Sequence, residues 1–271
     1  MAHVDVAGGR LFVEVSVDAD APAVVLLHAD AATSRMWDPL VPELAVDHRV
    51  ARFDRRGWGR SLTRATVFDP RQDLVEVLDR LGVSRAVLVG AGGGGRVAID
   101  LALSRSERVA GLVLLAPGVS GAPEPVLTIQ ERRAADEVAR AQAAGDARAL
   151  VEATVAMRSV GPSRASGGPG AEVVERLFAL HAENLDHVLA DLSPREPERP
   201  AWDRLGQVRV PSLVVVGDED LVAERHVASH VASHLPAVTF VLVEGAGHLP
   251  SVERPQEVAA AVRRWLAAYG L

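Results

Sequence analysis

The sequence contains no cysteine and no lysine. Without cysteine, disulfide bonds, thiolate catalysis and cysteine-based metal sites are excluded, and cysteine usage does not indicate a redox compartment. All 29 basic residues are therefore arginine, the net charge is -7, and no basic block indicates binding to nucleic acid.

The sequence also lacks the roughly 18 consecutive apolar residues that a membrane-spanning helix needs. Its first residues, MAHVDVAGGRLFVEV, show neither the basic segment nor the apolar run of a secretory signal. We therefore expect a soluble, cytoplasmic protein that does not bind membranes and that is a monomer or a homodimer.

Apolar runs rich in leucine and β-branched residues alternate with segments of helical periodicity at both ends of the chain. Such runs are typical of strands buried on both faces in a parallel sheet covered by helices. Strands are predicted at Leu11–Val17, Ala23–His28, Val50–Phe53, Arg85–Gly90, Val109–Leu115, Ser212–Gly217 and Val238–Val243. Helices are predicted at Asp73–Leu81, Arg96–Leu103, Val222–His234 and Gln256–Tyr269.

The middle of the chain interrupts this alternation. From about residue 121 to 199 it shows helical stretches, such as Thr128–Ala144 and Ala171–Leu192, and no convincing strand. Between them, SVGPSRASGGPG has the composition of a flexible loop. A length of 271 residues and a hydrophobic content of 48% suit one core with an insertion. We expect an α/β core at residues 1–120 and 201–271 and a helical cap at residues 121–200.

The segment AVLVGAGGGGRVAID predicts a strand, a glycine-rich turn and a helix, and it admits two interpretations. Gly90, Gly92 and Gly95 have the G-x-G-x-x-G spacing of a dinucleotide-binding loop. Such a loop usually follows the first strand, with an acidic residue about 20 positions further on. Here about three strands precede the loop, and Ala116 and Pro117 stand where the acid is expected. This favours the second interpretation, a catalytic turn of the G-x-S-x-G type.

Five segments, taken in chain order, resemble those of the α/β-hydrolase superfamily. They are VVLLHADAATSRMWDPL, RFDRRGWGRS, AVLVGAGGGGRVAI, PSLVVVGDEDLV and VEGAGHLPSVERPQEV. The resemblance covers nearly all of the chain outside the cap. It implies an α/β-hydrolase fold, which is a mostly parallel sheet flanked by helices with an inserted helical cap. We expect neither a cofactor nor a metal.

The resemblance also implies which residues form the catalytic site. His248 matches the catalytic histidine of the family, and Asp220 matches the acid that orients it, with Asp218 as the less favoured substitute. The backbone N–H groups of Asp30 and Gly93 match the two donors of the oxyanion hole.

Four further positions of the family pattern are candidates for substrate binding. His28 and Ala29 match a His-Gly pair at the end of an early strand, and Ala91 replaces a residue that is commonly histidine. Trp37 belongs to the same pattern, although a packing role is favoured over chemistry there.

Gly92 occupies the position of the nucleophile and has no side chain. A serine mechanism with an acyl-enzyme at this position is therefore excluded. Ala91 and Asp30 depart from the family pattern as well, which favours a natural loss over a single engineered substitution.

A histidine held by a carboxylate beside two N–H donors can remove a proton next to a carbonyl. The sequence favours such proton transfer, in an epimerase, isomerase or lyase acting on a peptide or small natural product. Peptide epimerases of the bottromycin type are similar in fold and in lacking the nucleophile. Asp30 then serves as a second acid or base, or only caps a turn.

Two other functions stay open. In one, His248 activates water against an ester, lactone or epoxide. In the other, the pocket binds a small molecule or a peptide without catalysis.

The remaining histidines are expected at the surface. His226, His230 and His234 recur at every fourth position, which aligns imidazoles as metal ligands require, but no acidic residue completes an H-E-x-x-H pattern. His181 and His187 belong to the cap, where they either line the pocket or, as the favoured interpretation, lie at the surface.

Overall fold

The structure is a computed structural model that describes residues 2–16, 21–162, 164 and 167–271. Its strands are β1 (Ala2–Val6), β2 (Gly9–Val15), β3 (Ala23–Leu27), β4 (Arg49–Phe53), β5 (Leu62–Thr63), β6 (Val67–Phe68), β7 (Ala86–Ala91), β8 (Val109–Leu115), β9 (Ser193–Pro194), β10 (Ser212–Gly217) and β11 (Val238–Val243). The α-helices are α1 (Val41–Leu44), α2 (Pro70–Arg80), α3 (Gly93–Ser104), α4 (Ile129–Ala144), α5 (Ala147–Thr154), α6 (Ala171–Ala182), α7 (Val222–His234), α8 (Pro250–Glu253) and α9 (Pro255–Tyr269). Shorter elements are the 3-10 helices η1 (Ser34–Trp37), η2 (Ser106–Arg108) and η4 (Trp202–Gln207) and the π-helix η3 (Val155–Val160).

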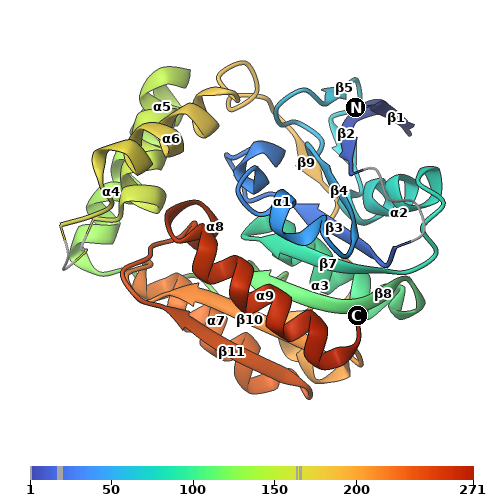
Figure 1. Ribbon diagram of the computed structural model, residues 1–271. Helices are drawn as coiled ribbons and strands as arrows, with labels where there is room; N and C mark the ends of the chain where they lie inside the picture. The colour runs from blue at the N-terminus through green and yellow to red at the C-terminus, as the bar shows by residue number, and fades with distance from the viewer. Residues whose placement is uncertain (1, 17–20, 163, 165–166) are drawn as a thin grey trace.

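The main sheet has the strand order β1-β2-β4-β3-β7-β8-β10-β11, with β5 paired to β2 (Figure 1). The strands from β4 to β11 in this order run parallel, and β1, β2 and β5 pair antiparallel at one end. The predicted mostly parallel sheet is therefore confirmed. Strand β1 and the two-residue strands β5, β6 and β9 were not predicted from the sequence.

Burial on both faces explains why the central strands form. In β3, Val25 and Leu27 belong to one buried apolar cluster, and Val24 and Leu26 belong to another on the opposite face. Residues of α2, α3 and α7 complete the first cluster, whereas η1, α1, α8 and α9 supply the second. Helices cover both faces, as β-branched and leucine runs in a parallel sheet require.

The cap follows β8 and precedes β10 in the chain. It contains α4, α5, η3 and α6, which lie together beyond one side of the sheet (Figure 1). A capping box between Thr128 and Glu131 begins α4, and Gly145 in the left-handed conformation ends it. The cap also contains a short strand that the sequence did not predict. This strand is Ser193–Pro194 (β9), and it pairs with Val67–Phe68 (β6).

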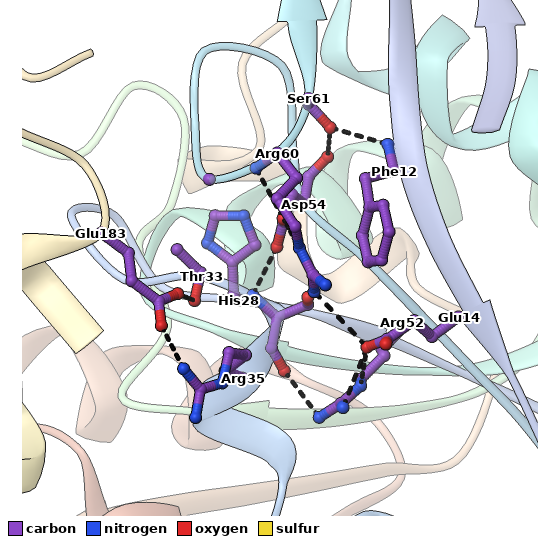
Figure 2. Close-up of polar contacts among 12 residues, drawn as sticks. Phe12, Glu14, His28, Thr33, Arg35, Arg52, Asp54, Arg60, Ser61 and Glu183 are labelled. Atoms are coloured by element: carbon purple, nitrogen blue, oxygen red, sulfur yellow. Dashed lines mark hydrogen bonds and ion pairs between the residues drawn. The ribbon is translucent and has the colours of Figure 1, made fainter. Parts of the chain in front are cut away.

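Helix α6 ends at Ala182 rather than continuing to residue 192, because the next side chains bind the core. The Glu183 carboxylate accepts a hydrogen bond from Thr33 at 2.7 Å and one from Arg35 at 2.5 Å (Figure 2). The buried Asn184 amide donates to the carbonyl of Ala31 at 2.9 Å. These contacts fasten the end of α6 to the loop after β3.

Close packing of α3 on the sheet explains two of the clustered glycines. A Cβ added to Gly94 would lie 2.6 Å from the carbonyl oxygen of His28, and one added to Gly90 would lie 2.6 Å from that of Gly94. Real Cβ atoms do not approach backbone so closely. Both glycines therefore let the helix approach β3 and β7. Across the described residues, none of the helices is long and apolar enough to cross a membrane.

We predict that Gly94→Ala destabilises the protein by about 1–3 kcal/mol, because the added methyl group overpacks the contact between α3 and β3. At a helix position with free space around it, a change from glycine to alanine would instead stabilise the protein by about 1 kcal/mol. Urea denaturation of Gly94→Ala and of the control Gly206→Ala, whose added Cβ would meet its nearest neighbour at 3.8 Å, measures the difference. A Gly94→Ala protein as stable as the wild type would contradict this account.

Candidate active site

The turn between β7 and α3 places Gly92 at the carboxyl edge of the sheet. Its backbone angles are φ 49° and ψ -120°, a left-handed conformation that glycine adopts without the steric cost of a Cβ. A Cβ added here would lie 3.8 Å from Nε2 of His248 and 3.4 Å from Cβ of Ala29, both ordinary contacts. A side chain at position 92 would thus reach His248.

His248 and Asp220 lie on loops that follow two paired parallel strands, β11 and β10. Nδ1 of His248 lies 3.1 Å from Oδ2 and 3.2 Å from Oδ1 of Asp220, and both residues are buried. Asp218 instead accepts a hydrogen bond from the N–H of Gly245 at 2.8 Å. The structure therefore places the acid that the sequence favoured, Asp220, against the histidine.

The carboxylate of Asp220 orients the ring of His248. With the N–H of a neutral ring on Nδ1, toward Asp220, the lone pair is on Nε2. Burial alone would lower the pKa of His248, but the charge and hydrogen bond of Asp220 outweigh it and raise the pKa above the usual 6.5. Among the described residues Nε2 has no hydrogen-bond partner, so it is available as a base.

Asp30 lies in the turn after β3, beside Gly93, and forms an ion pair with Arg55. The distance from Oδ1 of Asp30 to Nη2 of Arg55 is 2.6 Å. Desolvation would raise the pKa of the Asp30 carboxyl, but Arg55 outweighs it and holds the pKa below its usual range. Asp30 is therefore ionised at neutral pH, which disfavours the predicted role of proton donor.

Among the described residues, the backbone N–H groups of Asp30 and Gly93 have no hydrogen-bond acceptor. The Asp30 amide makes no hydrogen bond within the described part of the chain. Gly93 is the first residue of α3, where an amide has no acceptor inside the helix. Both groups are therefore able to bind a substrate oxygen.

Burial changes the interpretation of the four predicted substrate-binding residues, His28, Ala29, Ala91 and Trp37. Each is at most 2% exposed, and none lines the cavity of about 340 Å³ between the core and the cap. These side chains pack inside the protein and do not form the wall of that cavity, and their contact with a substrate stays a prediction.

His28 has a positioning role instead. Its Nδ1 lies 2.7 Å from the carbonyl oxygen of Ala29, and its Nε2 accepts the N–H of Arg55 at 2.8 Å. Burial lowers the pKa of His28 to about 3, so the ring is neutral, donating at Nδ1 and accepting at Nε2. His28 lies beside Asp54, whose carboxylate accepts the N–H groups of Ser34 and Arg60 (Figure 2). The ring thus joins the Asp30 turn to the loop after β4.

A cavity of about 340 Å³ lies between the core and the cap. Asp30, Gly93 and Trp58 line it from the core, and His187 and Leu192 line it from the cap. His248, Asp220 and Gly92 do not line it. The cavity therefore reaches the two predicted oxyanion donors, while the histidine lies beyond its wall.

Arg164 shows that part of the predicted flexible loop is anchored to the site. Its side chain is 2% exposed, lies 3.0 Å from Glu219 and 2.7 Å from Glu253, and donates to the carbonyl of Gly245 at 3.0 Å. Residues 163, 165 and 166 of that loop lie outside the described residues. No local pattern marks Arg164, because its partners lie 55 and 89 positions away.

The other histidines take different environments. His181 is 2% exposed, so the surface position favoured from the sequence is wrong for it, whereas His187 is half-buried at the cavity. On α7, His226 and His234 are exposed, and the ring of His230 stacks on Trp202 with centroids 3.7 Å apart. Over the described residues we find no group of three or more His, Asp or Glu side chains able to hold a metal.

Comparison with known proteins decides the family. Residues 24–261 match the sequence profile described as the Alpha/beta hydrolase family. The chain belongs to the alpha/beta hydrolase family. The predicted fold class is thereby confirmed. For the glycine run, the family favours the catalytic turn of the G-x-S-x-G type over the dinucleotide-binding loop.

Most of the relatives are named as hydrolases of several kinds, and one, 29% identical over 91% of this chain, is named as a 2-succinyl-6-hydroxy-2,4-cyclohexadiene-1-carboxylate synthase of Bacillus subtilis. The chain is 31% identical to RutD of Variovorax paradoxus, a candidate carbamate hydrolase, over 89% of this chain and 90% of the relative. It is 28% identical to epoxide hydrolase A of Mycobacterium tuberculosis, covering 99% and 97%. Among solved structures, the esterase RhEst1 of Rhodococcus sp. ECU1013 is similar, with a TM-score of 0.79, 25% identity and 98% coverage of both chains.

We predict that Gly92→Ser reacts with a fluorophosphonate, a reagent that labels activated serines. The hydroxyl would lie within reach of Nε2 of His248, which would remove its proton. Intact-protein mass spectrometry should show one adduct on Gly92→Ser and none on the wild type. A double variant that also carries His248→Gln should label at least about 10²-fold more slowly. A folded Gly92→Ser protein without adduct would contradict the assigned geometry.

Proposed function

We propose that the protein is an enzyme that hydrolyses activated esters or lactones without a covalent intermediate. His248 would remove a proton from water while the water attacks the substrate carbonyl. The observation that carries the proposal is the position of Nε2 of His248, which has its lone pair available and lies 3.8 Å from where a Cβ of residue 92 would be. A water oxygen at that position would be the nucleophile, in place of the side-chain hydroxyl that Gly92 lacks.

Names among the relatives support an acyl substrate. One relative, 24% identical over 92% of this chain, is named 3-oxoadipate enol-lactonase 1 of Acinetobacter baylyi. A solved structure at 25% identity and a TM-score of 0.73 is described as an N-acyl homoserine lactone degrading enzyme. Lactones and enol or aryl esters have good leaving groups or ring strain, so direct attack by water is feasible for them.

The ion pair of Asp30 supports hydrolysis over the proton transfer that the sequence favoured. An epimerase needs a group that returns the proton to the opposite face of the carbon. Asp30, the candidate for that step, is bound to Arg55 and carries no proton at neutral pH. Hydrolysis needs only one base, and His248 provides it.

The reaction follows from the placement of these groups. Nε2 of His248 accepts a proton from water, the water oxygen forms a bond to the carbonyl carbon, and the carbonyl electron pair moves to its oxygen. The N–H groups of Asp30 and Gly93 stabilise that oxyanion. Asp220 stabilises the imidazolium. As the intermediate collapses, the leaving oxygen takes the proton from His248, and an acid and an alcohol are released.

A single-turnover experiment in ¹⁸O-water tests this route with dihydrocoumarin and 4-nitrophenyl acetate. With enzyme in excess, the acid formed in the first turnover should contain one ¹⁸O, because water attacks directly. If a protein carboxylate attacked the carbonyl and water then cleaved the resulting anhydride at the protein carbon, the acid of the first turnover would carry unlabelled oxygen instead. His248→Gln should lower kcat/KM by about 10²–10⁴-fold.

Other outcomes of the same assay would overturn the proposal. Uptake of deuterium next to the carbonyl in heavy water, without cleavage and dependent on His248, would assign proton transfer. Ligand binding without turnover or exchange across the panel would assign a binding protein.

We predict a pH profile set by His248, since only the neutral imidazole accepts a proton. Because Asp220 raises the pKa of His248 above 6.5, kcat/KM should fall as the pH decreases through a value above 6.5. In Asp220→Asn the negative charge is gone, so the acid limb should move to lower pH while the plateau falls. An acid limb that stays in place in Asp220→Asn would show that another group controls the rate.

A further inference from the structure

His181 lies beside the candidate site although it belongs to the cap. Leu180, its neighbour on α6, shares an apolar cluster with Leu249, the neighbour of His248. Helix α6 also packs against α8, which begins at Pro250, two residues after His248. Asn184, three residues after His181, donates a hydrogen bond to the carbonyl of Ala31, the residue after Asp30. His181 therefore lies where the cap meets two loops of the core, the loop after β11 that contains His248 and the loop after β3 that contains Asp30.

Within the described residues, only one nitrogen of this buried ring has a hydrogen-bond partner. Nε2 of His181 lies 3.1 Å from the hydroxyl of Ser159, a buried residue of the π-helix η3. Nδ1 is buried and makes no hydrogen bond within the described part of the chain. Leaving a buried polar atom unpaired is costly, so such an atom calls for an explanation.

The surroundings keep the ring neutral. Burial, with a smaller contribution from the charge of His248, lowers the pKa of His181 to about 4. A neutral imidazole has one N–H and one lone pair. When the hydroxyl of Ser159 donates to Nε2, the N–H is on Nδ1, and the ring presents a hydrogen-bond donor without an acceptor.

There is room for one acceptor beside the ring. His181, Ala31 and Asn184 line a small cavity of about 20 Å³. A water-sized group needs about 10–15 Å³ on this scale, so one oxygen atom fits.

We propose that His181 is a second catalytic residue, one that donates a hydrogen bond from Nδ1 to the leaving-group oxygen of the substrate. This inference rests on the proposed hydrolysis. The Asp30 and Gly93 amides are assigned to the carbonyl oxygen, and the other oxygen that gains charge is the leaving oxygen, which lies next to His248. His181 stabilises that charge and keeps its own proton, while the proton that the leaving group receives comes from His248. A neutral imidazole is suited to this task because its N–H polarises an oxygen without titrating.

Leaving-group dependence tests the inference. In His181→Phe, kcat for δ-valerolactone, whose alkoxide is a poor leaving group, should fall about 10²-fold, the usual loss for one transition-state donor. For 4-nitrophenyl acetate, whose phenolate needs little stabilisation, the loss should be no more than about threefold. KM should change little for either substrate. His181→Gln, which retains an N–H donor, should recover part of kcat, and His226→Gln, the same change at an exposed position, should match the wild type.

A spectroscopic measurement tests the tautomer independently of turnover. ¹⁵N NMR should show His181 as the neutral Nδ1–H tautomer down to about pH 4, and Ser159→Ala should lose this preference. A ring found with its proton on Nε2 would overturn the inference.

The two proposals fail in different ways. Equal loss of kcat for both substrates in His181→Phe, with lowered thermal stability, would make His181 a structural residue of the cap and leave the role of His248 standing. Full activity of His181→Phe would remove only the second donor. Full activity of His248→Gln would overturn the proposed function itself, and the role of His181 with it.

Discussion

The arrangement of the site depends on one buried cation. The side chain of Arg164, from the cap, lies between Glu219 and Glu253 and joins three segments that are distant in the sequence. Glu219 immediately precedes the acid Asp220, and the carboxylate of Glu253 accepts the N–H of Gly247, the residue before His248. Removing one partner of a buried ion pair costs about 3–5 kcal/mol, so the two loops and the cap are held in one geometry.

The parts of the fold that the sequence predicted are those encoded locally. Val222–His234 and Val238–Val243 have the predicted bounds because periodicity and apolar content define them without distant partners. Asp220 and His248 were identified by the resemblance of their segments to the family. Each lies in the loop after a strand of the parallel sheet, and the carboxyl ends of adjacent parallel strands meet at one edge, so the two loops lie close together.

The parts that the sequence did not predict depend on contacts between distant residues. The burial of His181 and of Arg164 follows from the way the cap packs on the core, which no periodicity records. His28 looked like a substrate contact because of its motif, yet its ring is occupied by Ala29 and Arg55. Likewise, α6 ends early because Glu183 and Asn184 bind the core, a tertiary effect that outweighs the helical propensity of the following residues.

Asn184 also bears on how a ligand enters. Its side chain takes part in three hydrogen bonds to the core, with the N–H of Gly59 and the carbonyls of Ala31 and Ala32. At about 1 kcal/mol each, an opening motion that lifted this end of α6 would cost about 3 kcal/mol from these bonds alone. Such an open state would make up only about one molecule in 10² at any moment. Ligand exchange that required this motion would therefore depend on a sparsely populated state of the protein.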